Sequence, residues 1–373
     1  MTRWWLILAS LLFACGDNGG NTTPDSQTPD GPEQDAPPDV NPLAQIQGTG
    51  LCDDAGCQTI NDGILEYEPQ FALYDDGATK RRWMQLPAGE QIDTTDMDHW
   101  VFPVGTKFWK EFSVGGTRVE TRFITKVLED DLAPNSWLYN TYVWNEAQDV
   151  SELLTAGASD ANGTTHDVPA RSQCKECHEA LSPGRVLGFQ AIQMDFDSSF
   201  IDLEDLIAQD KLTVEPPGNA GPRFPLPGTA VDKAALGYLH ANCGHCHNPS
   251  SSTHDTVDLE LLLEVGKLAT VQDTPAFRSA VKTDADQCNE GPNGDTGNGI
   301  DEDGDGRIDN GCPDQTLIID AVNYPFMIVP GDPDDSGLLQ RMKTTGIRRM
   351  PKIMVEVPDP AGDEAITAWI NSL

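Results

Sequence analysis

The chain has 373 residues, which is long enough for two or three domains of ordinary size and a substantial hydrophobic core. It contains 60 Asp and Glu against 24 Lys and Arg, a formal net charge of −36. This charge argues against binding to nucleic acid and against electrostatic docking on anionic lipid, and it favours partner proteins with basic docking patches.

The first residues predict export. Arg3 is followed by an apolar stretch, residues 4–14, that is too short to span a bilayer as a mature helix. The stretch ends in Leu12-Phe13-Ala14-Cys15, which resembles the lipobox of bacterial lipoproteins. That resemblance implies a signal peptide over residues 1–14 and a lipid anchor on Cys15, and the following Gly16 favours the outer membrane. A plain secretory signal with a free Cys15, or an uncleaved anchor, is the alternative.

Behind the anchor, the composition separates a linker from a β-rich region. Residues 16–45 are rich in Pro, Asp, Gly and Thr and carry too little apolar surface to fold. From about residue 64 to 145, short aromatic and β-branched segments alternate with Gly and Pro, which predicts a small antiparallel β unit. These segments are Trp83–Leu86, Trp100–Phe102, Lys107–Phe112, Arg118–Val127 and Ser136–Trp144.

Two Cys-x-x-Cys-His motifs follow, and they predict two covalently bound c-type haems. Each motif places two thiols three positions apart, for the two vinyl groups, and a His next to the second thiol, for the iron. The residues are Cys174, Cys177 and His178 in the first motif, and Cys243, Cys246 and His247 in the second. A Cys-x-x-Cys redox pair does not need the His, and the two pairs stand too far apart for a zinc ribbon.

Helical patterns surround the second motif. A helix-like stretch over residues 201–212 is followed by a Pro- and Gly-rich joint, residues 215–228, and then by helical spacing over 229–242. The last helix is expected to begin near Asp359-Pro360 and to bury Ala365, Ile366, Trp369 and Ile370.

A methionine is the predicted distal ligand of the second haem. Met350 stands before Pro351 in an irregular stretch, and Pro restricts such a loop, whereas Met342 shares a helical face with two leucines and is expected in the core. Ordinary packing is the alternative role of Met350. For the first haem the candidates are Met194, His240, His166 and His99, or an open iron site.

The remaining cysteines and an acidic segment suggest further cross-links. Cys52, Cys57, Cys288 and Cys312 form two close groups that would pair locally in an oxidising compartment, although four cysteines permit three connectivities. The segment between Cys288 and Cys312 contains a run with the spacing of a calcium loop. It has carboxylates at positions 1, 3, 5 and 9 and Gly at position 6, and position 7 of such a loop binds through its backbone carbonyl. The residues concerned are Asp301, Asp303, Asp305, Arg307 and Asp309. The run resembles thrombospondin-type and related bacterial Asp-rich calcium repeats, which implies one structural Ca²⁺; a solvated insertion is the alternative.

An ordered series of short motifs gives the chain a wider resemblance. It includes Trp100-Val-Phe-Pro-Val-Gly-Thr106, Gln173-Cys-Lys-Glu-Cys-His178, Tyr238-Leu-His-Ala-Asn-Cys-Gly-His-Cys-His-Asn248, Val329-Pro-Gly-Asp-Pro333 and Met350-Pro351. In this series the chain resembles a family of bacterial di-haem c-type cytochromes over most of residues 64–373. The resemblance implies a β-containing front part, two haems and periplasmic electron transfer, often beside sugar or alcohol oxidation systems. Two departures are the acidic insertion between Cys288 and Cys312, and Met194 at a position where an aliphatic residue is expected.

These observations predict an α+β chain: a lipidated Cys and linker over 15–47, a β-rich domain over 48–165, a first haem segment over 166–228, and a mainly helical cytochrome c-like domain over 229–373 that contains the acidic insertion 284–313. We expect a periplasmic lipoprotein that carries electrons between redox partner proteins, such as a sugar or alcohol dehydrogenase, rather than an enzyme. A haem peroxidase with an open first haem, assisted by His166 or His240, is one alternative. A partner-binding lipoprotein in which the haems are secondary is another.

Overall fold

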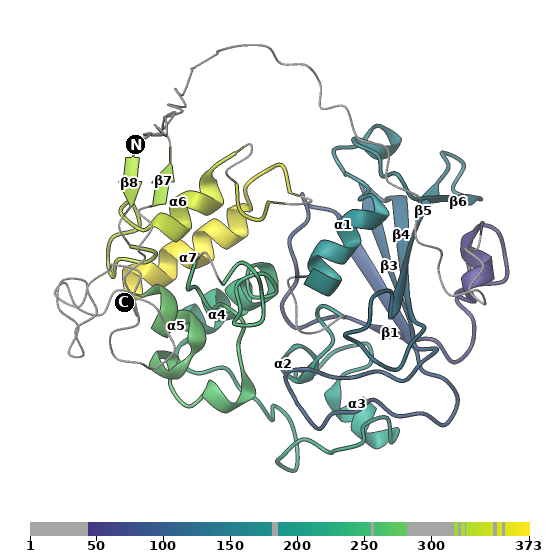
Figure 1. The fold of residues 1–373 in the computed structure, drawn as a ribbon, viewed down its shortest axis with the longest axis horizontal. Helices are drawn as coiled ribbons and strands as arrows, with labels where there is room; N and C mark the ends of the chain where they lie inside the picture. Colours follow the sequence, from purple (N-terminus) through teal and green to yellow (C-terminus); the bar gives the residue numbers. More distant parts are fainter. Residues whose placement is uncertain are drawn as a thin grey trace, which may run out of the picture.

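The structure is a computed structural model, and it describes residues 44–180, 186–254, 257–281, 317–319, 322–324, 326–345, 349–352 and 355–373. A six-stranded antiparallel sheet and a group of helices lie side by side (Figure 1). The prediction of a mixed α+β chain with an antiparallel sheet is therefore confirmed.

The sheet is a meander in which each strand pairs with the next one in the sequence. The hairpin between Val114 and Thr117 turns through Gly115 and Gly116, whose φ angles of 58° and 84° favour glycine. The strands are β1 (Leu65–Tyr67), β2 (Thr79–Gln85), β3 (Lys107–Val114), β4 (Thr117–Lys126), β5 (Trp137–Trp144) and β6 (Ser151–Leu154). Four of the five predicted aromatic segments fall in β2 to β5.

The fifth predicted segment is not a strand. Val101 forms one isolated bridge with Asp93 and is exposed, while Trp100 and Phe102 on either side are buried. Pro103, which follows directly, has no N–H to offer a neighbouring strand. The aromatic residues therefore mark packing on the sheet and not an additional strand.

The helices follow the sheet in sequence. They are α1 (Arg171–Lys175), α2 (Ala191–Met194), α3 (Leu203–Ala208), α4 (Ala230–Asn242), α5 (Pro275–Ala280), α6 (Gly337–Lys343) and α7 (Pro360–Ser372), and a small hairpin of β7 (Leu317–Ile319) and β8 (Val322–Tyr324) precedes α6. Asp359 caps α7 by accepting the N–H of Ala361, with Pro360 at the first turn as expected. Ile366, Trp369 and Ile370 are buried, whereas Ala365 is only partly buried.

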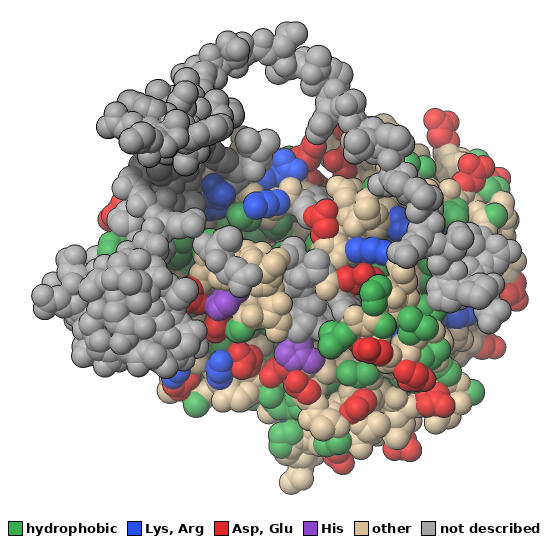
Figure 2. Space-filling model, in the orientation of Figure 1, with side chains coloured by type: hydrophobic (Ala, Val, Ile, Leu, Met, Phe, Trp, Pro, Cys, Tyr) green, Lys and Arg blue, Asp and Glu red, His purple; other side chains and the backbone are tan. Residues whose placement is uncertain are grey.

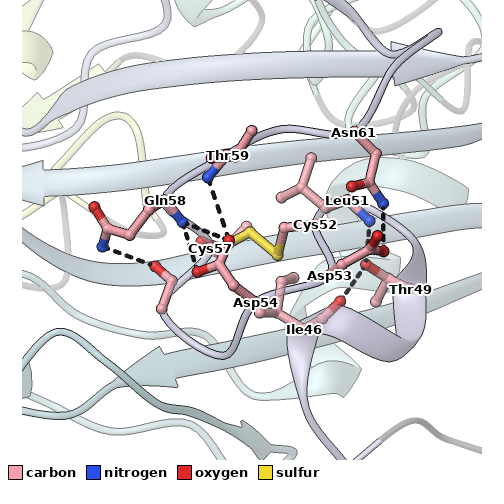
Figure 3. Close-up of a disulfide and its surroundings, with 12 residues drawn as sticks. Ile46, Thr49, Leu51, Cys52, Asp53, Asp54, Cys57, Gln58, Thr59 and Asn61 are labelled. Carbon is pink, nitrogen blue, oxygen red and sulfur yellow. Dashed lines mark hydrogen bonds between the residues drawn. A yellow bond between two sulfur atoms is a disulfide. The ribbon is translucent and has the colours of Figure 1, made fainter.

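Both faces of the sheet are covered. On one face, a cluster that includes Trp83, Trp109 and Trp144 packs against the segment that contains the Cys52–Cys57 disulfide. That disulfide confirms one of the two predicted local pairs; Figure 3 shows the loop that it closes, where Asp54 accepts the N–H groups of Gln58 and Thr59. The other predicted pair, Cys288 and Cys312, lies outside the described residues.

On the other face, one apolar core runs without interruption from the sheet into the helices, from Phe108 of β3 to Leu239 of α4 and Trp369 of α7. The loop after β1 ties the two parts together, because Asn242 at the end of α4 accepts the N–H of Tyr74 and donates to the carbonyl of Ala72. None of the helices in the described part of the chain is both long and apolar enough to cross a lipid bilayer.

Candidate functional site

The first Cys-x-x-Cys-His motif begins in α1 and continues into a π-helical turn, Glu176–Ala180. Single π turns are frequent at functional sites. Cys174 and Cys177 are free, partly buried thiols, and both line a cavity together with His178. The His178 ring lies 5.6 Å from the ring of Tyr139 on β5, at the sheet wall of the same cavity. The three side chains predicted to hold the first haem therefore line the same cavity.

This cavity lies between the sheet and the helical part of the chain. Its apolar lining includes Tyr67, Phe71, Phe108, Ile124, Val186 and Leu262. The cavity volume is about 190 Å³. On the face shown in Figure 2, several lysine and arginine side chains lie around the contact between the sheet and the helices, and acidic side chains are spread over the rest.

The second motif follows α4 directly. Thr229 caps that helix and Asp232 completes the capping box, so the helix begins and ends as the sequence predicts. Gly244, inside the motif, packs so closely on the backbone of Leu262 that a Cβ atom at this position would lie 2.8 Å from its Cα. Only glycine fits this approach, which brings His245 of the motif to the cavity.

The ligand expected from the second motif is available for binding. Burial lowers the pKa of His247 to about 4, which makes its imidazole neutral at pH 7, the form that binds a metal. Its Nδ1 atom is buried and has no hydrogen-bond partner among the described residues. Cys243 and Cys246 are free thiols, and burial raises the pKa of each to about 12. A buried, unpartnered imidazole beside two thiols fits the donor set of a c-type haem.

The two motifs are neighbours in space. The pKa of Cys246 is raised first by burial and then by the nearby thiol of Cys177, which belongs to the other motif. Lys352 also acts on Cys246 and on His247, so segment 349–352 lies beside the second motif. Met350 belongs to this segment and is partly buried, and Pro351 lines the cavity. The role of Met350 as a ligand stays a prediction.

Three other candidate ligands of the first haem, Met194, His240 and His166, make contacts within the protein. Met194 is fully buried in the core and is not among the residues that line the cavity. Met342, which the sequence analysis expected in the core, is buried there and does not line the cavity either. His240 does line the cavity, but its Nδ1 accepts the N–H of Leu263 at 3.0 Å, which places the proton of the neutral ring on Nε2 and leaves no free lone pair.

The third candidate, His166, is buried with its Nε2 2.7 Å from Oε1 of Glu120. That carboxylate oxygen also accepts from Arg122 of β4. His166 therefore belongs to a buried charged network on the sheet, and it is not among the cavity-lining residues.

His99, the remaining candidate ligand for the first haem, also lines the cavity. Its Nδ1 lies 3.1 Å from Asp96, and its Nε2 is buried with no hydrogen-bond partner among the described residues. A carboxylate that holds one ring nitrogen while the other is free is the usual second-shell arrangement of a metal-binding histidine. The Asp96-Met-Asp-His99 spacing was the available sequence signal.

The sequence analysis also missed a set of basic side chains in the cavity wall: Arg82, Lys110 and Arg122. They stand in three neighbouring strands, and only the register of the sheet brings them together. Among the described residues, His254, Asp258 and Glu260 form one further group whose ligand atoms lie within 4.8 Å of one another, at a partly exposed position. Cys15 and the predicted calcium loop with Asp301, Asp303, Asp305, Arg307 and Asp309 lie outside the described residues.

No protein-family model matches the chain, and no curated protein or solved structure shows detectable similarity to it. The candidate site is therefore defined by its own residues: two Cys-x-x-Cys-His motifs that lie beside each other at the contact between a sheet and a group of helices.

Proposed function

We propose that this chain is an exported c-type cytochrome that carries two covalently attached haems and transfers electrons between periplasmic partner proteins. The observation that carries the proposal is that the two motifs, one at the sheet and one at the end of α4, reach the same cavity: Cys174, Cys177 and His178 line it together with His245 of the second motif. Two haems attached at these motifs would be neighbours, which suits electron transfer from one to the other.

Different residues of the chain would hold each of the two haems. Cys174 and Cys177 would form the thioether bonds of the first haem and Cys243 and Cys246 those of the second, and His178 and His247 would bind the two irons. Met350 would be a further ligand to the iron of the second haem. Bound haem would supply an iron that changes between Fe(II) and Fe(III), and a Met ligand raises the reduction potential relative to two imidazoles.

The remaining parts of the proposal concern location. A lipid on Cys15 would anchor the chain to the outer membrane, with residues 16–45 as the tether. The pair Cys288–Cys312 and one Ca²⁺ on the acidic segment would stabilise an insertion, and chelation should then lower the melting temperature. Partners with basic docking surfaces, such as a sugar or alcohol dehydrogenase, suit the net charge of −36.

The test is expression of the full chain together with the haem maturation machinery, followed by intact-mass measurement. We expect two added haems in the wild-type protein and one each in Cys174→Ser/Cys177→Ser and Cys243→Ser/Cys246→Ser. The matched control is Cys52→Ser/Cys57→Ser, which removes two thiols that form a disulfide and should retain both haems. A wild-type protein without added porphyrin mass would refute the proposal.

The peroxidase alternative makes a different prediction. An open first haem would give a five-coordinate ferric spectrum and peroxide turnover. His166 and His240, the residues considered for acid–base chemistry, already contact Glu120 and the Leu263 N–H respectively. Absorption and magnetic circular dichroism spectra of each single-haem variant would decide between these functions.

A further inference from the structure

Three basic residues form a row across the face of the sheet that lines the cavity. Lys110 of β3 stands directly opposite Arg82 of β2 and directly opposite Arg122 of β4. Residues opposite each other in neighbouring strands point to the same face, with Cβ atoms about 5 Å apart. All three side chains line the cavity that also contains Cys174, Cys177 and His178.

Like charges in such a row repel one another, and the described residues compensate only part of this repulsion. Arg122 is paired, because both its Nε and a terminal nitrogen donate to Glu120. Lys80, on the same face of β2, donates to the carbonyl of Leu73. The carboxylate of Asp75, in the loop after β1, interacts electrostatically with Arg82 and Lys110, and the carboxylate of Glu68 interacts with Arg82.

Arg82 and Lys110 remain without a direct partner. Only 9% of Arg82 is exposed, and its guanidinium forms no hydrogen bond or ion pair with the described residues. The Lys110 ammonium lies 4.8 Å from the centre of the Phe112 ring and makes no ion pair within the described part of the chain. Burial, together with Arg82, Lys80 and Arg122, holds the pKa of Lys110 well below its ordinary value. Buried charges are normally paired, so this wall of the cavity has the character of an anion site.

The position of the row relative to the motifs indicates which anion. The row lines the same cavity as Cys174 and Cys177 of the first motif and His245 of the second. A group attached to Cys174 and Cys177 would thus have an apolar lining around it and cations at one side. A porphyrin with two carboxylate side chains matches that distribution, and the planar guanidinium of Arg82 can bind a carboxylate through two parallel hydrogen bonds.

We propose that Arg82 and Lys110 form the carboxylate site for the propionate groups of the haem attached to Cys174 and Cys177. The inference rests on the proposed function, since it needs a haem at the first motif. It adds what the motif does not supply: a sequence-distant pair of cations that orients the porphyrin and compensates its charge.

The experiment compares Arg82→Gln and Lys110→Gln with the matched control Arg81→Gln. Arg81 is the next residue in β2, points to the opposite face and pairs with Glu66 at 2.8 Å. All variants are made in the Cys243→Ser/Cys246→Ser background, which carries only the first haem, and intact mass verifies that this haem is present. Absence of the haem from the unmutated background would refute the proposed function and not this inference specifically.

Removing a cation from a propionate favours the ferric state. We expect the reduction equilibrium constant of the first haem to fall about tenfold, or ~59 mV for a one-electron couple, in Arg82→Gln and Lys110→Gln but not in Arg81→Gln. The propionate bending bands in resonance Raman spectra should shift in the same two variants, which a charge acting only from a distance would not produce. Unchanged potentials and unchanged bands with the first haem present would overturn the inference.

A stability measurement distinguishes loss of the propionate contact from poor folding of a variant. Arg82→Met should lower the melting temperature of the haem-loaded protein, because a bound propionate loses its partner. In a Cys174→Ser/Cys177→Ser chain, which lacks the first haem, the same substitution should raise the melting temperature, because it removes a buried unpaired cation. A decrease of equal size in both proteins would show that Arg82 is only structural.

Discussion

Nε2 of His166 lies 2.7 Å from Oε1 of Glu120, and both side chains are almost completely excluded from solvent. The same oxygen accepts from Arg122, so one carboxylate holds a histidine and a guanidinium together on the sheet beside the first motif. Burial by itself raises the pKa of Glu120, but Arg122 and His166 outweigh burial and hold the pKa below its ordinary value.

Glu120→Gln should therefore be strongly destabilising at neutral pH. Removing one partner of a buried ion pair costs about 3–5 kcal/mol, since the other charge stays buried. A carboxyl whose pKa is lowered by folding contributes stability above its unfolded pKa, and this contribution is lost as the pH falls through the folded value. The difference between wild type and Glu120→Gln, measured by denaturant unfolding, should thus shrink on acidification. Glu152→Gln, at an exposed position of β6, is the control, and an equal loss in both variants would contradict the expectation.

Much of the fold follows from local sequence signals. Alternation of aromatic and β-branched residues predicted β2 to β5, and Thr229 and Asp359 predicted where α4 and α7 begin. The sequence did not predict β1 and β6, which have only three and four residues and are defined by pairing with their neighbours.

The candidate site was predictable only where it is local. The two Cys-x-x-Cys-His motifs stand out because covalent haem attachment needs a fixed spacing along the chain. Arg82, Lys110 and Arg122 meet through strand register, and His166 reaches Glu120 from a distant segment, so no spacing in the sequence indicates either group. Charged residues in a predicted strand are expected to face solvent, and here the second face of the sheet is buried as well.

Gly362→Ala should loosen the contact between α4 and α7. The ring of Tyr238 lies so close to Gly362 that a Cβ atom would overlap with it. Forcing additional volume into a packed contact usually costs about 1–3 kcal/mol. Gly266→Ala is the matched control, because nothing lies within 4 Å of the Cβ position there. Thermal unfolding should separate the two variants, and equal melting temperatures would count against the tight packing.

Asp98→Asn should increase stability at pH 7 and not at pH 4. Burial raises the pKa of Asp98 from 3.8 to about 6, although its carboxylate accepts the N–H of Val265. Stability from a group with a raised pKa is fully present below the unfolded value and is lost as the pH rises through the folded value. Asparagine imitates the protonated carboxyl at every pH.

Asp93→Asn, in the same loop, should change the stability in the opposite direction. Hydrogen bonds from Thr95 lower the pKa of Asp93, so its substitution should reduce the melting temperature at pH 7, with the difference disappearing in acid. Melting curves from about pH 2 to 7 test both variants, because the contribution of Asp93 is lost only as the pH falls below its unfolded pKa and through its lower folded pKa. A pH-independent effect of Asp98→Asn would argue against a raised pKa at that position.

Met350→Leu should change the second haem specifically. Leucine keeps the volume but cannot bind iron, so we expect loss of the spectral signature of a thioether ligand and a lower reduction potential. Met342→Leu, in the core near the same end of the chain, should leave the spectrum and the potential unchanged. If both variants kept the wild-type spectrum, Met350 would not be a ligand and its role would be packing.

His99→Ala should alter a haem through its free Nε2, which lies buried at the cavity. We expect one low-spin six-coordinate haem to become five-coordinate, as seen by magnetic circular dichroism. His254→Ala is the control, because His254 is not among the cavity-lining residues. If the spectra of His99→Ala were identical to those of the wild type, His99 would not be an iron ligand, and its ring would only contact Asp96.

The cavity has Tyr67 in one wall and Val355 in another, so it closes only after nearly the whole polypeptide has been made and folded back upon itself. A chain that ended before Val355 would lack part of the wall around Cys174 and Cys177. If these thiols carry a porphyrin, as proposed, the C-terminal segment is the last part of the chain to complete its surroundings.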